Sequence, residues 1–547
     1  MNRQICLLLI TVGATQAAEL TIGDGKQWSF AGGEWTQNAG GVIRPPDRRN
    51  LHSRAFYTGQ SFSDVTAEFD YNPDYRETGT GNAGLILRAS DSAHFYVVHF
   101  PWGGQQLRAK HFWAGIAKVD GDGYLRNLRF GWVPGLPSET DRWYHVKVVA
   151  KGPLISVWVD GIRAAEVSDA SYRSGHVGLL GYGWYAFRNV KVAGASAPAP
   201  KWNRSIAVES HARDLPMTSA EMPSNCVAPN GDVLLAAGET LIRSRDKGRT
   251  WGAAEALPGF LGKVGDYGSS MFRTNGGRLL VMVYRSQAAT GQATPEILIS
   301  ESADNGRTWS TPAASLVAGG WPAVPKNLSV YGPLVETADG GLLRFLYGGM
   351  GGEGSPPDAL GRVTNVVSWG SVHCKAFAIR STDGGKSWSA PIEVDQPSWA
   401  DRKRGTILGS LDLTEPTGVA IGNKVLVLIR PIYSSTMWQC RSADGGANWD
   451  AAARATFPGY AQSMVRSRAG AIAVAHRFPN YALNLSTDDG LHWDDGTIID
   501  YPAWAMGTLV EVEPNVLLAT YMNTNRKMPL LYQLIRITPQ GVRPEFK

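Results

Sequence analysis

Charged residues and cysteines are scarce in this chain, and each scarcity excludes a class of protein. Only 18% of the 547 residues are Asp, Glu, Lys or Arg, and the net charge of +5 is spread without a basic run. A nucleic-acid partner is therefore not expected, because nucleic-acid-binding surfaces concentrate lysine and arginine. The four cysteines show no metal-type spacing, so neither a metal centre nor a disulfide framework is predicted.

Long apolar runs are also scarce. The run Ile5 to Ala14 follows Arg3 and precedes the small-residue stretch Thr15-Gln16-Ala17, which is the pattern of a signal peptide over residues 1–17. No later stretch reaches membrane-spanning length. We therefore expect a secreted or periplasmic protein without membrane insertion.

Glycine and tryptophan, by contrast, are abundant, with 63 and 19 residues. This composition is typical of many short strands joined by turns, and it predicts an all-β protein. A stiff linker of small residues and prolines at 194–200 divides the chain. It separates a predicted β-sandwich at 19–193 from a second domain at 201–547.

An eight-residue pattern, Ser-x-Asp-x-Gly-x-x-Trp, occurs five times in the second domain. In such a turn the Ser and Asp side chains bond the backbone, Gly takes a positive φ, and Trp fills the space beneath. The unequal spacing of the copies favours propeller blades over a tight solenoid. Six segments with one strand-turn-strand plan predict six blades. The copies span 244–251, 302–309, 381–388, 442–449 and 486–493, and the segments span 223–237, 269–284, 332–347, 416–430, 461–476 and 507–521.

This pattern is the Asp box, and the region from about residue 201 onward resembles the sialidase superfamily, which implies a six-bladed β-propeller. The first domain is similar to concanavalin-like jelly rolls of the laminin-G type, with Trp143 and the segment 175–179 in matching order. The two resemblances together imply a lectin-like jelly-roll β-sandwich followed by a sialidase-like propeller. Because Asp boxes lie on the periphery of the blades, they indicate the fold and not the site.

Propeller geometry predicts where a pocket lies. The first strand of each blade lines the central channel, so residues just before it and just after the second strand gather at one end of the axis. Acidic, basic and phenolic groups gathered there are costly unless they are paired or used. The strand entries supply Glu221, Asp266, Tyr267, Tyr331, Asp412 and Glu415, and the second-strand exits supply Arg285, Tyr347, Arg430, His476 and Arg477.

The sialidase resemblance implies roles for part of this set. Sialidases hold the substrate carboxylate with three arginines and use a tyrosine nucleophile activated by a glutamate, together with an aspartate acid/base. Glu415 and Arg430 match the glutamate and the second arginine in spacing, and Arg477 matches the third arginine.

Three features depart from the sialidase pattern. Glu221-Met222-Pro223 stands where an Arg-Ile-Pro motif is expected, and Met506 stands where the tyrosine is expected. The segment 238–240 runs almost directly into the first Asp box, so the loop that carries the acid is missing. A glutamate facing an incoming carboxylate repels it, which argues against sialic acid as the substrate.

We therefore predict an exo-acting glycoside hydrolase that needs no cofactor or metal and acts on an oligo- or polysaccharide. Glu221 and Asp266 are the predicted catalytic carboxyl groups. Glu415 either activates Tyr331 or Tyr267 or pairs with Arg430. The predicted substrate-binding residues are Arg285, Arg430, Arg477, Tyr267, Tyr347, Asp412 and His476.

Two other functions stay open. A polysaccharide lyase would use Tyr331, His373 or His476 as base and acid while arginines neutralise a uronate, and a glycan-binding protein would show no turnover. The insertion 348–375, which holds His373, is predicted to cover the pocket and favour chain ends. In the first domain, Trp102, Trp113 and Trp132 either stack on sugar rings or lie in a core or interface. The turn Asp120-Gly121-Asp122-Gly123 is read as an ordinary turn, with calcium binding as the alternative.

Overall fold

The computed structural model describes residues 17–23, 25–46, 53–73, 80–103, 111–139, 142–182, 185–203, 210–321, 328–349, 374–394, 413–431, 436–501, 505–523 and 527–545. Within these ranges strands dominate, and the helical segments are the short α2 (Gln287–Thr290) and the 3-10 turn η1 (Gly259–Leu261). The all-β prediction is therefore confirmed. Except for Ala17, the predicted signal peptide lies outside the described residues. No helix in the described part of the chain is long and apolar enough to cross a membrane.

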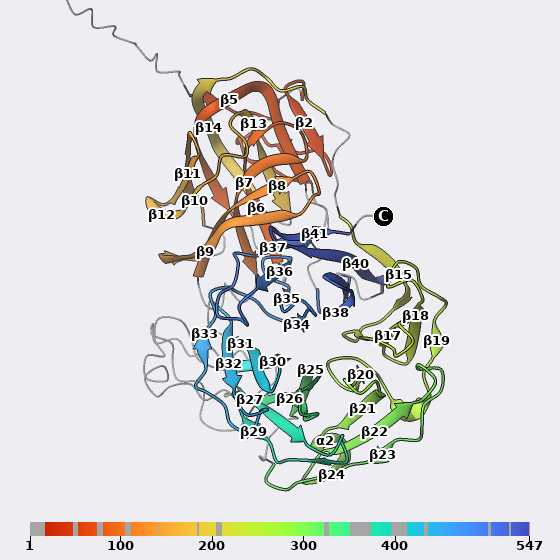
Figure 1. Cartoon of the computed structure of the whole chain (residues 1–547). Coiled ribbons are helices and arrows are strands. Elements are labelled where there is room, and N and C mark those ends of the chain that lie inside the picture. Colours follow the sequence, from red (N-terminus) through yellow and green to blue (C-terminus); the bar gives the residue numbers. More distant parts are fainter. Residues whose placement is uncertain are drawn as a thin grey trace, which may run out of the picture.

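The N-terminal part is a jelly-roll β-sandwich, drawn in red to yellow in Figure 1. Its long strand β5 (Ser53–Asn72) takes part in two groups of strands. The first half pairs with β2 (Trp28–Ala31) and β13 (Gly175–Tyr182), and the second half pairs with β10 (Tyr144–Lys151) and β14 (Ala186–Ser196). The other strands are β1 (Ala18–Glu19), β3 (Thr36–Gln37), β4 (Ile43–Arg44), β6 (Thr80–Ala89), β7 (His94–Gly103), β8 (His111–Asp120), β9 (Leu125–Pro137), β11 (Leu154–Val159) and β12 (Ile162–Ser168).

The sandwich core follows from the two-residue period of its strands. In β10 the residues Tyr144, Val146, Val148 and Ala150 are buried, while the residues between them are exposed or half-buried. Side chains of a strand alternate between its two faces, so one face of β10 fills the core and the other meets solvent.

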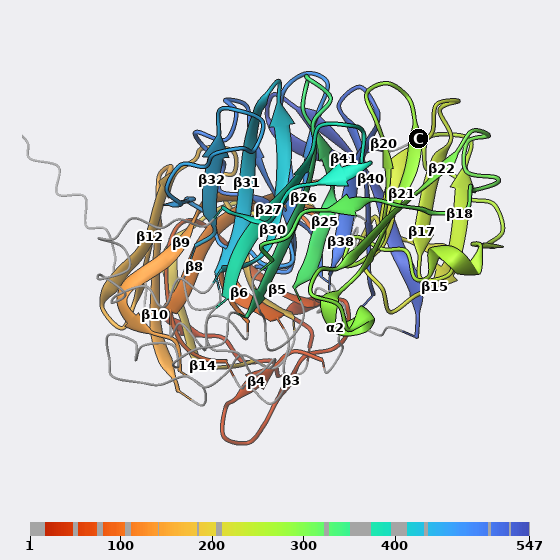
Figure 2. The same cartoon turned by 90° about the horizontal axis from the view of Figure 1, so that it is seen from below.

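The C-terminal part is a β-propeller, whose antiparallel sheets stand side by side around a centre in Figures 1 and 2. Five of its sheets are separate from the sandwich. The first sheet contains β16 (Ser224–Val227), β17 (Val233–Ala237), β18 (Thr240–Ser244) and β19 (Glu255–Ala256), and the second contains β20 (Ser270–Arg273), β21 (Leu279–Arg285), β22 (Glu296–Ser302) and β23 (Ala313–Ala314). The third contains β25 (Ser329–Glu336), β26 (Leu342–Gly349), β27 (Cys374–Ser381) and β29 (Ile392–Glu393), and the fourth contains β30 (Leu413–Ile421), β31 (Lys424–Pro431), β32 (Trp438–Ser442) and β33 (Ala453–Arg454). The fifth contains β38 (Gly507–Glu513), β39 (Val516–Tyr521), β40 (Pro529–Thr538), β41 (Gly541–Pro544) and β15 (Arg213–Thr218). The short strands β24 (Leu316–Val317) and β28 (Ser387–Trp388) pair in parallel.

One more run of strands continues into the sandwich. Strands β34 (Ser463–Arg466), β35 (Ile472–His476), β36 (Tyr481–Ser486) and β37 (Thr497–Asp500) pair in sequence order, and β37 also pairs with β9 of the sandwich.

The propeller ring is closed by a strand from the start of the C-terminal part. Strand β15 pairs with β40, with Arg213 opposite Tyr532. The sequence predicts this outer strand near 206–209, and that stretch lies outside the described residues. Closure of this kind removes free sheet edges, which would otherwise pair with other chains.

The Asp-box turns have the predicted bonding. In the first, Ser244 Oγ donates to Asp246 Oδ1 at 2.8 Å and accepts from the Gly248 amide at 2.7 Å. Gly248 has a φ of +86°, which glycine adopts without steric cost. The residue before the tryptophan also contributes, because the Thr250 hydroxyl donates to Asp246 Oδ2 at 2.6 Å. At the same position the other boxes carry Thr308, Ser387, Asn448 and His492, each bonded to its own aspartate.

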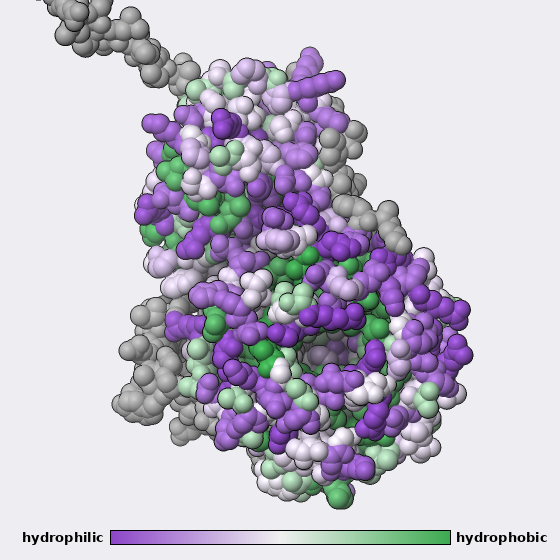
Figure 3. Space-filling view, in the orientation of Figure 1, coloured by the Kyte–Doolittle hydropathy of each residue, from purple (hydrophilic) through white to green (hydrophobic). Residues whose placement is uncertain are grey.

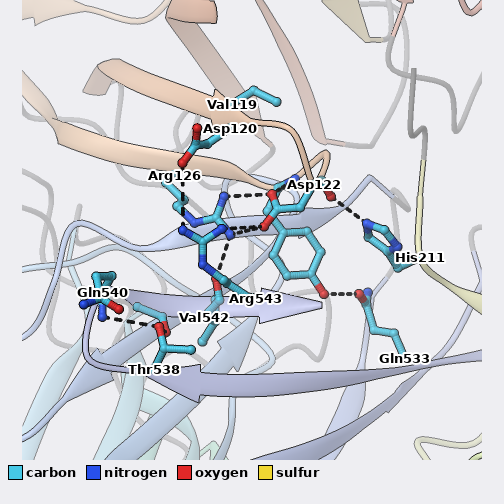
Figure 4. A network of polar contacts seen from close by, with 12 residues as sticks. Val119, Asp120, Asp122, Arg126, His211, Gln533, Thr538, Gln540, Val542 and Arg543 are labelled. Atoms are coloured by element: carbon cyan, nitrogen blue, oxygen red, sulfur yellow. Dashed lines mark hydrogen bonds and ion pairs between the residues drawn. The ribbon is translucent and has the colours of Figure 1, made fainter. Parts of the chain in front are cut away.

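Polar contacts join the two parts of the molecule around the turn that contains Asp122 (Figure 4). Arg126 Nη1 donates to Asp122 Oδ1 at 2.8 Å, and Arg543 Nη1 lies 3.4 Å from Oδ2 of the same carboxylate. The Tyr124 hydroxyl donates to Gln533 Oε1 at 2.7 Å. The turn at 120–123 therefore lies in the interface, where arginines from both parts engage the Asp122 carboxylate.

Apolar contacts join the same two parts. Trp113 is buried and packs in one cluster with Phe130, Tyr460 and Phe478, and Trp132 is partly buried beside it. Trp113 and Trp132 therefore lie in the interface between the two parts, which is one of the two positions predicted for them. The side chain of Trp102 lies outside the described residues.

Candidate functional site

Three tyrosines from neighbouring blades meet near the centre of the propeller. Tyr267 precedes β20, and Tyr331 and Tyr347 lie on β25 and β26. Their rings pack edge to face, with centroids 5.5 to 6.4 Å apart, and the hydroxyls of Tyr267 and Tyr347 hydrogen-bond to each other. Met222 and Met506 pack against this group. The space-filling view shows a hollow at the centre of the ring (Figure 3).

Glu415 and Arg430 form a buried ion pair between β30 and β31. Glu415 is 3% exposed, and its Oε1 accepts a hydrogen bond from Arg430 Nη1 at 2.6 Å. Its Oε2 accepts one from the backbone amide of Ala461 at 3.0 Å. Both carboxylate oxygens are therefore engaged. Glu415 is predicted either to activate a tyrosine or to pair with Arg430, and this geometry corresponds to the pairing with Arg430.

The backbone at this ion pair is strained. Glu415 has a φ of +53° and Ala461 a φ of +54°, a left-handed conformation that residues with a β-carbon rarely adopt. The strands β30 and β31 also shift register between Thr414 and Thr417, on either side of the glutamate. Strained backbone of this kind concentrates at functional sites, where it fixes side chains in one orientation.

Arg430 and Arg477 both lie over the ring of Tyr460. Their guanidinium carbons are 5.2 and 5.1 Å from the ring centroid, within range of a cation–π interaction. Burial and the nearby charge of Arg430 lower the pKa of Arg477. Against the effect of burial, Glu415 raises the pKa of Arg430. The geometry thus brings together the two arginines, the glutamate and an aromatic ring that the sequence reasoning did not select.

Asp266 provides a buried carboxyl group of a different kind. It is 1% exposed, and its backbone amide donates to the Met222 carbonyl at 3.2 Å. Burial raises the pKa of Asp266 to about 6, although Arg344 and the hydroxyls of Ser224 and Thr508 favour the ionised form. A carboxyl group with such a pKa is partly protonated near neutral pH, as a general acid must be.

Arg344 organises the loop between Asp266 and Gly268. This side chain on β26 is fully buried, and it donates to Ser270 Oγ and to the Gly268 carbonyl, each at 2.9 Å, and to the carbonyl of Gly332. Burial lowers the pKa of Arg344 to about 10. Arg344 is not among the residues predicted from the sequence. Its place within the apolar run Leu342–Tyr347 nevertheless indicates a structural role, because a guanidinium buried there needs several hydrogen-bond acceptors.

Other predicted residues have surroundings that differ from this cluster. Glu221 is half-exposed and 3.4 Å from Lys263 Nζ, and Arg285 is exposed and bonded to Glu296 at 2.6 Å. His476 is buried, stacks on Phe457 and contacts Asn484 Oδ1 at 2.7 Å.

Burial lowers the pKa of His476 to about 4, so the ring is neutral at neutral pH. Asp412 and His373 lie outside the described residues. The described residues contain no cluster of three or more His, Cys, Asp or Glu suited to a metal ion.

Two family models match the chain, one in the sandwich and one in the propeller. Residues 268–501 match the model of the BNR repeat-like domain, and residues 20–193 match the model of the 3-keto-alpha-glucoside-1,2-lyase-like domain. The C-terminal part therefore contains a repeat-like domain, in agreement with the repeated turn pattern, and the N-terminal part matches a separate domain model. No curated protein matches the chain.

Several solved structures match the chain at low sequence identity. The NanB sialidase of Streptococcus pneumoniae is 11% identical with a TM-score of 0.41, over 87% of this chain and 95% of that one. The Penicillium chrysogenum alpha-L-arabinanase is 16% identical with a TM-score of 0.39, over 60% and 97%. The carbohydrate binding module CBM66 from Bacillus subtilis is 22% identical with a TM-score of 0.24, over 31% and 96%.

Proposed function

We propose that this protein is a secreted, exo-acting glycoside hydrolase that cleaves an acidic sugar residue from the end of a glycan, with a catalytic set unlike that of sialidases. Its domains are a jelly roll at 19–193, a linker at 194–200 and a propeller at 201–547 whose six blades include β34–β37. The observation that carries the proposal is the cluster of Arg430, Arg477 and Tyr460 beside three tyrosines. Two adjacent guanidinium groups provide the donors that a carboxylate of the substrate requires. Glu221, which would repel that carboxylate, is half-exposed and lies 3.4 Å from Lys263 Nζ, so its charge is partly compensated.

Asp266 serves as the general acid in this proposal. Its raised pKa keeps a proton available, and its neighbour in the chain, Tyr267, packs against Tyr331 and Tyr347. Glu415 fixes Arg430 and does not itself react, because both its oxygens accept hydrogen bonds. Glu221 or a tyrosine then remains for the second role, as base or nucleophile.

A panel of neutral and uronic aryl glycosides and uronate-containing oligosaccharides tests this proposal. Release of the terminal acidic sugar, measured as new reducing ends, is the expected result. Asp266→Asn should abolish the release of sugars from substrates with poor leaving groups. The control substitution Arg285→Ala should retain activity. Release of neutral sugars alone, or of internal fragments, would contradict the proposal.

A uronate lyase is the second candidate, because the cluster contains buried phenols, the residue type that serves as base and acid in such a reaction. The hydroxyls of Tyr267 and Tyr347 bond to each other, and the hydroxyl of Tyr331 is buried without a hydrogen-bond partner among the described residues. A lyase would generate an unsaturated uronate that absorbs in the ultraviolet. Ultraviolet absorbance of the products therefore separates the two reactions, and binding without any product would indicate a glycan-binding protein.

A further inference from the structure

An aromatic contact path connects the jelly roll to the charged cluster of the propeller. Phe478 stacks on Tyr460 with ring centroids 5.9 Å apart and an interplanar angle of 18°. Trp113 on β8 contacts Phe478 edge to face at 5.8 Å, and Phe130 on β9 stacks on Trp113 at 5.1 Å. All four residues are buried. The ring that carries the two arginines therefore rests, through Phe478, on the other domain.

Each propeller aromatic in this path is also a chain neighbour of the cluster. Phe478 follows Arg477 directly, and the Arg477 amide donates to the Tyr460 carbonyl at 3.2 Å. Tyr460 precedes Ala461, whose amide holds Glu415. A shift of the Tyr460 and Phe478 rings would thus displace both the arginine pair and the backbone donor of the glutamate.

We infer that Trp113 and Phe130 of the jelly roll are positioning residues for the propeller site. Close-packed aromatic rings have few alternative arrangements, so the sandwich restricts Phe478 and Tyr460 to one. These restrict Arg430, Arg477 and Glu415 through the contacts above. A displacement of about 1 Å is enough to lengthen and weaken the contacts that these groups would make with a substrate carboxylate. The inference rests on the proposed function only for this catalytic consequence.

The local consequence is measurable without any substrate. Trp113→Ala should increase hydrogen exchange of the amides of Ala461 and Arg477 by at least about 10-fold, because removal of the ring allows local opening. Phe112→Ala is the matched control, since Phe112 lies on the same strand and packs inside the sandwich against Phe100 and Tyr144, at 5.8 and 4.8 Å. It should loosen the sandwich strands and leave the two propeller amides unchanged. Trp113→Phe should retain protection.

Phe478→Leu tests the same path from the propeller side, and it should expose the same two amides even if Trp113→Ala is too unstable to purify. Unchanged exchange at Ala461 and Arg477 in both variants, or an equal increase in the Phe112→Ala control, overturns the inference.

Kinetics test the catalytic consequence with an acidic aryl glycoside. Trp113→Ala should raise KM at least about 10-fold with a smaller change in kcat, because the arginines that bind the carboxylate are displaced. Trp113→Phe should restore KM, and Phe112→Ala should not raise it. A fall in kcat at constant KM would contradict the assignment. If no variant and no wild-type enzyme releases sugar, the proposed function fails, while the exchange experiment still decides the positioning role.

Discussion

The rim and the centre of the propeller satisfy their polar groups in opposite ways. At the rim, Asp246 is bonded by Ser244 and Thr250, which lie within four residues of it in the chain. At the centre, Glu415 is bonded by Arg430 and Ala461, which are 15 and 46 residues away. A rim contact is therefore contained in one short motif that any blade can carry, whereas at the centre Glu415 combines a contact within its own hairpin with one from Ala461, which precedes the next run of strands. The rim maintains the fold, and the centre is where chemistry can be specific.

The substitution expected to have the largest effect, on both stability and activity, is Arg430→Met at the centre. The substitution leaves Glu415 buried without its counter-charge, which costs about 3–5 kcal/mol of unfolding free energy. It should also lower kcat/KM for an acidic glycoside by about 100-fold, the loss expected of a charge-assisted contact. Denaturant unfolding and steady-state kinetics measure the two effects. Arg430→Lys, which keeps the charge but not the planar fork, should recover part of the stability and little of the activity.

Asp266→Asn should change the pH dependence of stability. Asp266 has a pKa raised to about 6 in the folded state from an ordinary value of 3.8, so between these values the folded protein binds a proton that the unfolded chain has released. Its contribution is present below pH 3.8 and is lost as the pH rises through 6. The wild type should therefore lose about 2 kcal/mol relative to the variant between pH 4 and pH 7. Unfolding curves at several pH values measure this, and parallel curves for the two proteins would contradict a buried, protonated Asp266.

For a rim substitution, Asp246→Asn, the stability difference from the wild type should change with pH in the opposite direction. Although slight burial opposes ionisation, the Thr250 hydroxyl and amide lower the pKa of Asp246 to about 2. Its stabilisation is present above pH 3.8 and is lost as the pH falls through 2. We expect the variant to be about 1–2 kcal/mol less stable at neutral pH, with the difference vanishing in acid. Activity should be unchanged, and a large loss of activity would show that the rim and the centre are coupled.

The smallest effect is expected from Arg285→Ala. Arg285 and its partner Glu296 are 49% and 39% exposed, and an exposed ion pair contributes less than about 1 kcal/mol. Binding of an acidic glycan should not change by more than about twofold, because the side chain is engaged by Glu296 at 2.6 Å. Isothermal titration with a uronate oligosaccharide checks this. A large loss of affinity would instead support the prediction from the sequence that Arg285 binds substrate.

The same contrast explains which parts of the structure the sequence predicts. The Asp-box turns and the strand-rich composition depend on near neighbours, so the repeat region, the sandwich and their order follow from local patterns. The pairing of Glu415 with Arg430 is also predictable, because both flank one hairpin of known length. Tyr460 was missed because it lies outside a strand end, and its importance depends on Arg430, Arg477 and the partner Phe478 meeting in space.

Two further predicted residues, Arg285 and His476, have their contacts outside the central cluster for one physical reason. The rule that residues at strand ends gather at the axis takes no account of side-chain direction. It selected Arg285, which lies opposite Glu296 in the β21–β22 ladder and bonds to it, and His476, which points into the blade and stacks on Phe457. Arg344 is overlooked by the same rule, because it lies inside a strand and not at its end. Its side chain nevertheless supports the loop of Tyr267 by donating to a backbone carbonyl.

The pairing of β37 with β9 has a consequence for how the chain can be cut. If the sandwich were deleted, Thr497 and Ile498 would lose their partners and leave a row of open backbone donors and acceptors on an outer strand. The isolated propeller would then be expected to self-associate through that strand, and the tryptophan-facing surface of Phe478 would be uncovered as well. Expression of the two halves as independent modules is thus a route to aggregates, and the halves are better regarded as one cooperative unit.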